Sequence, residues 1–84
     1  GRYNETISAC RVALEEMGVR SAPLNLLNGP TRGTIGKTDR RQAMLASLLH
    51  YAHPPHHGGS EVYSRDEARM TLHMTAAAIA SGPF

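Results

Sequence analysis

Apolar side chains recur at steps of three and four residues in three stretches of this chain, and this period predicts three amphipathic helices. The first helix is expected from about residue 4 to residue 17. Asn4 is a suitable N-cap, and Gly18 favours the left-handed conformation that ends many helices. Its predicted buried face consists of Ile7, Cys10, Ala13, Leu14 and Met17.

The second helix is expected from about residue 38 to residue 52, with Thr38 as its N-cap. It ends before Pro54, because the residue that precedes a proline is disfavoured in the α region. Its predicted buried face consists of Met44, Leu45, Leu48, Leu49 and Ala52.

The third helix follows Ser64, which has the capping-box spacing to Glu67. Gly82 and Pro83 end this helix. Its predicted core face consists of Ala68, Leu72, Ala76 and Ile79. A second apolar flank consists of Met70, Met74 and Ala77.

Residues 19–37 separate the first two helices and contain two prolines and three glycines. Leucines at positions 24, 26 and 27 interrupt this stretch, so we expect part of it to pack on the helices. The pattern predicts an all-α fold, a small three-helix bundle with a long, partly packed loop. We expect residues 1–84 to form one domain, and the chain is compatible with being a fragment of a larger protein.

A chain of 84 residues with eleven alanines and one phenylalanine has a thin core. The second apolar flank of the third helix exceeds what such a core covers. We therefore expect Met70, Met74 and Ala77 to lie in an interface, either in a homodimer or against the remainder of a parent protein. No cofactor is expected.

The single cysteine excludes an internal disulfide and is compatible with a reducing, cytoplasmic location. No stretch reaches the roughly 18 apolar residues of a membrane span, so no membrane association is expected. The net charge is +2, and Lys37, Arg40 and Arg41 form a local basic patch. This patch is the candidate nucleic-acid-binding site, with RNA as a compatible partner.

Four of the five histidines lie between His50 and His57. His53, His56, His57 and Glu61 are of the types that bind divalent metals. The prolines at 54 and 55, however, prevent the helical i, i+4 arrangement of ligands. A solvated loop is the alternative interpretation, and no metal ligand is assigned.

His50 and His53 share a face at the end of the second helix. A histidine base beside Arg41 is a plausible arrangement for RNA cleavage, because arginine stabilises the charge that develops on the phosphate. The alternative is that both histidines only cap carbonyl groups at the helix end.

Three segments carry a resemblance to a known family. Residues 9–18 contain an Arg-x-x-Leu-Glu pattern at Arg11, and residues 48–54 contain a histidine-bearing helix end. Residues 63–68 then read Tyr-Ser-Arg-Asp-Glu-Ala. From about residue 4 to residue 81, the chain resembles HEPN-superfamily helical domains, particularly abortive-infection C-terminal-like domains.

The resemblance implies an all-α bundle, often dimeric, attached to defence or nucleic-acid-handling proteins, and in active members a metal-independent ribonuclease. Active members carry an arginine followed four to six residues later by a histidine. Here Arg41 precedes His50 by nine residues, which puts the two on opposite faces of one helix. The sequence therefore favours a non-enzymatic interaction or dimerisation module, with a small ribonuclease that uses Arg41, His50 and His53 as the alternative.

Overall fold

The computed structural model describes residues 2–27, 32–53 and 62–82 of the chain. These ranges contain the α-helices α1 (Arg2–Glu16), α2 (Lys37–Tyr51) and α3 (Arg65–Ala80), and they contain no β-strand. The predicted all-α fold with three helices is confirmed.

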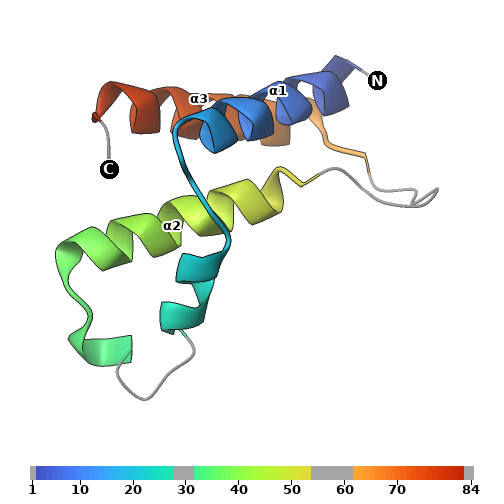
Figure 1. Ribbon diagram of the computed structural model, residues 1–84. Helices are drawn as coiled ribbons and strands as arrows, with labels where there is room; N and C mark the ends of the chain where they lie inside the picture. Colours follow the sequence, from blue (N-terminus) through green and yellow to red (C-terminus); the bar gives the residue numbers. More distant parts are fainter. Residues whose placement is uncertain (1, 28–31, 54–61, 83–84) are drawn as a thin grey trace.

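The helices form two layers (Figure 1). α1 and α3 lie side by side and run in the same direction, whereas α2 lies below them and runs in the opposite direction. The loop between α1 and α2 contains the 3-10 helices η1 (Ala22–Leu27) and η2 (Arg32–Thr34), and η1 packs against α2. The expectation of a partly packed loop is therefore confirmed, while the side chains of the three leucines lie outside the described part.

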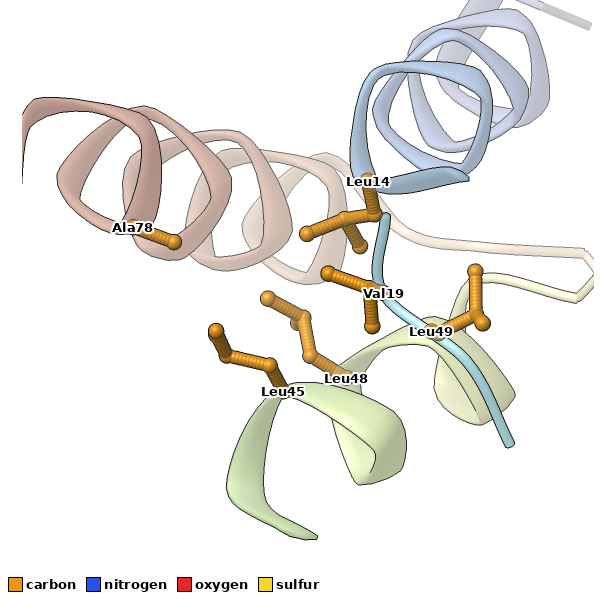
Figure 2. Packing of buried hydrophobic residues seen from close by; sticks show 6 residues of the cluster. All are labelled: Leu14, Val19, Leu45, Leu48, Leu49 and Ala78. Carbon is orange, nitrogen blue, oxygen red and sulfur yellow. The ribbon is translucent and has the colours of Figure 1, made fainter. Parts of the chain in front are cut away.

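The larger core cluster joins all three helices (Figure 2). Leu14 of α1 and Val19 point toward the leucines of α2, while Ala78 is the contribution of α3. A smaller cluster, at the opposite end of the molecule, consists of Ile7, Ala52 and Ala68. Most of the predicted faces of α1 and α2 are thus buried, but Met44 is 56% exposed, so its assignment to the core was wrong.

Ala68 of α3 is buried as predicted, but from Thr71 onward the buried face lies one residue before the predicted core face. Leu72 and Ile79 are 48% and 51% exposed, and Ala76 is also exposed. The buried residues of this helix are Ala68, Thr71, Thr75 and Ala78. α3 packs on α1 through these small side chains, because short side chains allow two helix axes to approach closely. The larger Leu72 and Ile79 side chains therefore lie outside the contact.

The helix ends are set partly by local sequence. Gly18 has φ 94°, and the amides of Gly18 and Val19 bond the carbonyls of Glu15 and Leu14 at 3.0 Å, which is a Schellman motif. The capping box between Ser64 and Glu67 is also present.

The two other predicted caps were wrong. α1 begins at Arg2, two residues before Asn4, and the Asn4 Oδ1 atom instead accepts a hydrogen bond from the Tyr63 amide at 2.9 Å. The N-cap of α2 is Gly36 rather than Thr38, and it makes no side-chain cap bond. In both cases the helix begins before the polar residue that the sequence favours as its cap.

Candidate functional site

An apolar groove of about 440 Å³ lies between α2 and α3. Its floor is formed by the buried residues Leu45, Leu48 and Ala78. Met44 on α2 and Met74 on α3 also line it, and these two side chains are 56% and 43% exposed. Long, adaptable and half-exposed methionine side chains suit a surface that packs against another apolar surface.

One end of the groove is closed by Arg41. Its Nη2 atom donates to the Ser81 hydroxyl at 2.6 Å, to the Gly82 carbonyl at 3.1 Å and to the Ala78 carbonyl at 3.5 Å. These acceptors lie at the C-terminal end of α3, where carbonyl groups lack helical partners and the helix dipole is negative. Arg41 therefore holds the start of α2 against the end of α3.

Outside the groove lining, two tyrosines fix the C-terminal end of α2. The Tyr51 hydroxyl donates to the Glu67 carboxylate at 3.0 Å, which connects the end of α2 to the start of α3. The Tyr63 hydroxyl donates to the carbonyl of Tyr51 and to that of His53, at 3.2 Å for the latter. The two tyrosine rings meet edge to face, with centroids 5.5 Å apart.

These contacts change the pKa values of Glu67 and Tyr51. The Ser64 amide, followed by the Tyr51 and Ser64 hydroxyls, bonds the Glu67 carboxylate and lowers its pKa. Burial, followed by the nearby Glu67 carboxylate, raises the pKa of Tyr51. At neutral pH the pair is therefore a neutral phenol that donates to a carboxylate.

Charge is distributed unevenly along the groove. Lys37 lines one end, and the neighbouring Arg40 side chain is exposed. Asp66 is exposed in the first turn of α3 and lies outside the groove lining, on the stripe that continues at steps of four residues to Met70 and Met74. The groove is thus lined mainly by apolar side chains, with Lys37 and Arg41 at one end.

Two of the three predicted interface residues, Met74 and Ala77, line this groove. Met70 does not line it, although it is exposed one turn before Met74 on α3. Sequence reasoning missed Met44 as a residue of the groove, because Met44 is spaced along α2 in the same way as the core residues. It also missed Arg41 and Tyr63 as helix-end donors, because each contact spans residues distant in the sequence.

The predicted catalytic residues are not brought together as a set. Arg41 lies in the first turns of α2, and nine residues of helix place His50 about 13 Å further along the axis. His50 and His53 are both exposed at the far end of α2. The Tyr63 hydroxyl donates to the carbonyls of Tyr51 and His53 at that end, and the capping role considered for the histidines stays a prediction.

Within the described ranges, no group of three or more metal-binding side chains is assembled. His56, His57 and Glu61 lie outside those ranges, so the loop interpretation stays a prediction. Cys10 is buried, which confirms its place in the core, and Arg11 and Glu15 form an ion pair at 3.0 Å.

No family model, curated protein or solved structure matches this chain. The resemblance to HEPN domains therefore stays a prediction. None of the helices in the described ranges combines the length and the apolar character needed to span a bilayer.

Proposed function

We propose that this chain is a non-enzymatic helical interaction module that forms a two-fold dimer through the groove between α2 and α3. The exposed apolar groove with Met44 and Met74 at its surface carries this proposal. Contiguous exposed apolar surface in a small protein commonly marks an interaction site, and methionine is enriched in such sites.

The distribution of charge favours a second copy of the same chain as the occupant. A two-fold axis near the middle of the groove brings the end that carries Lys37 in one copy toward the first turn of α3 in the other, which carries Asp66. Lys37 of one copy then lies near Asp66 of the other, and the contact occurs twice by symmetry. The methionines of both copies meet at the axis.

The resemblance to HEPN domains supports a module of this kind within a larger defence-type or nucleic-acid-associated protein, since such domains often dimerise. The ribonuclease alternative has less support, because Arg41 is bonded to the end of α3 and is distant from His50 along α2. It stays a prediction of the sequence.

Sedimentation equilibrium tests the dimer. At about 10–100 μM the chain should sediment as twice its mass of 9.1 kDa. Met74→Glu should weaken association by about 100-fold or more, because the dimer would bury an unpaired carboxylate. Val12→Glu is the matched control, since Val12 on α1 is similarly exposed, at 45%, and lies outside the groove. A 9.1 kDa species at all these concentrations, or equal effects of the two variants, would contradict the proposal.

A further inference from the structure

A second cleft, of about 490 Å³, lies between the first turns of α1 and α3, and it shares no residue with the groove. Three of the residues that line it are arginines: Arg2, Arg65 and Arg69. No aspartate or glutamate is among its described lining residues. The cleft therefore concentrates positive charge without a carboxylate to balance it.

These arginines have no acidic partner in the described part of the chain, where the ion pair that is present joins Arg11 and Glu15. Arg65 and Arg69 lie one turn apart on α3, and like charges at this spacing repel. The Arg2 guanidinium lies over the ring of Tyr3, 5.5 Å from its centroid. The guanidinium groups of Arg65 and Arg69 are thus available to an external anion.

The parallel course of α1 and α3 adds to this positive potential, because both helices begin beside the cleft. Cations near a helix start are unfavourable on their own, whereas an anion there is favourable. The arginines therefore weaken the isolated fold slightly, and a bound anion would offset the repulsion.

An apolar surface adjoins the arginines. Ala68 lies beneath the cleft, the Tyr3 ring is half-buried at its edge, and Leu72 lines it with 48% of its surface exposed. A planar aromatic or aliphatic surface beside guanidinium groups is the combination that single nucleotides and unpaired strands bind, with the base stacked and the phosphate paired. Leu72 does not pack in the core, and a contact with a base would give this exposed side chain a function.

We propose that this cleft binds one nucleotide, with Arg65 and Arg69 on its phosphate and with Leu72 against its base. The nucleotide can be a free mononucleotide or part of a single strand, because both offer the same phosphate and base. The proposal is independent of the dimer, since it uses the opposite side of α3.

Fluorescence anisotropy and calorimetry at about 50 mM salt test it, with a labelled single-stranded RNA hexamer, AMP and inorganic phosphate as probes. Binding of the hexamer or AMP should weaken about tenfold or more in Arg65→Gln and again in Arg69→Gln. Leu72→Ser should weaken both nucleotide probes without altering phosphate binding. Arg20→Gln is the matched control, because Arg20 is an exposed arginine that follows α1, outside the cleft.

Each outcome decides the matter. AMP binding as tightly as the hexamer supports a free nucleotide, whereas binding of the hexamer alone supports a strand. Equal binding of phosphate and AMP would overturn the base contact. No binding at millimolar concentration, or equal loss in Arg20→Gln, would overturn the site. Arg65→Gln and Arg69→Gln should melt at or above the wild-type temperature, which excludes unfolding as the cause of lost binding.

Discussion

At the scale of single residues, Thr75 is a buried polar side chain without a hydrogen bond among the described residues. Its side chain is 3% exposed, and its Oγ1 atom has no hydrogen-bond partner in the described structure. A buried unpaired hydroxyl is unfavourable, so Thr75→Val should stabilise the fold by about 1 kcal/mol. For a domain of this size, thermal unfolding should show a rise in Tm of about 4–8 °C.

Thr71→Val is the matched control for this change. Thr71 is also buried, but its hydroxyl donates to the Glu67 carbonyl at 2.8 Å. Replacing it removes a satisfied bond, so this variant should be neutral or less stable than wild type. A drop in Tm for Thr75→Val would show that its hydroxyl has a partner in solution.

Glu67 should make stability depend on pH in the acid range. Its pKa is lowered in the folded state, chiefly by the bond from the Ser64 amide. A lowered folded-state pKa gives stability that is present above the unfolded value of about 4.3 and is lost as the pH falls through the folded-state pKa. Urea unfolding between pH 7 and pH 2 should therefore show a loss that Glu67→Gln reduces. Glu16→Gln, at an exposed position in the last turn of α1, should leave this loss of stability unchanged.

At the scale of elements, the ends of α2 and α3 depend on each other. Arg41 bonds three acceptors at the end of α3, so Arg41→Ala should destabilise the fold by about 1–2 kcal/mol. Amide hydrogen exchange should increase most in the last turn of α3. Arg40→Ala is the control, because this neighbouring side chain is exposed. Equal exchange in the two variants would mean that the Arg41 contacts do not hold α3 in solution.

At the scale of the whole molecule, the proposed dimer brings Lys37 at the end of the groove of one copy toward Asp66 of the other. Lys37→Asp and Asp66→Lys should each weaken association, by several-fold at low salt. The double variant should recover part of the loss, because the positive and the negative charge of each pair then change places and attract again. Sedimentation at about 50 mM and 500 mM salt measures both effects. Additive weakening in the double variant would contradict the two-fold arrangement.

The three helices could be predicted from the sequence, because the signals that start, continue and end a helix are local. The apolar period, Gly18 after the first helix and the Ser64–Glu67 box act within a few residues of one another. The period alone did not define the buried face of α3, because two apolar stripes lie on this helix. Leu72 and Ile79 follow the helical period as well as Ala68 does, yet they are exposed.

The amino-acid sequence by itself determined that this chain forms three helices, where most of their ends lie, and that apolar side chains exceed the core. Only the tertiary structure decided which stripe of α3 meets α1, that Arg41 caps α3, and that arginines from two helices line one cleft. Those outcomes depend on how closely two helices approach and in which direction they run. Such distances are set by side chains far apart in the chain, so no local pattern encodes them.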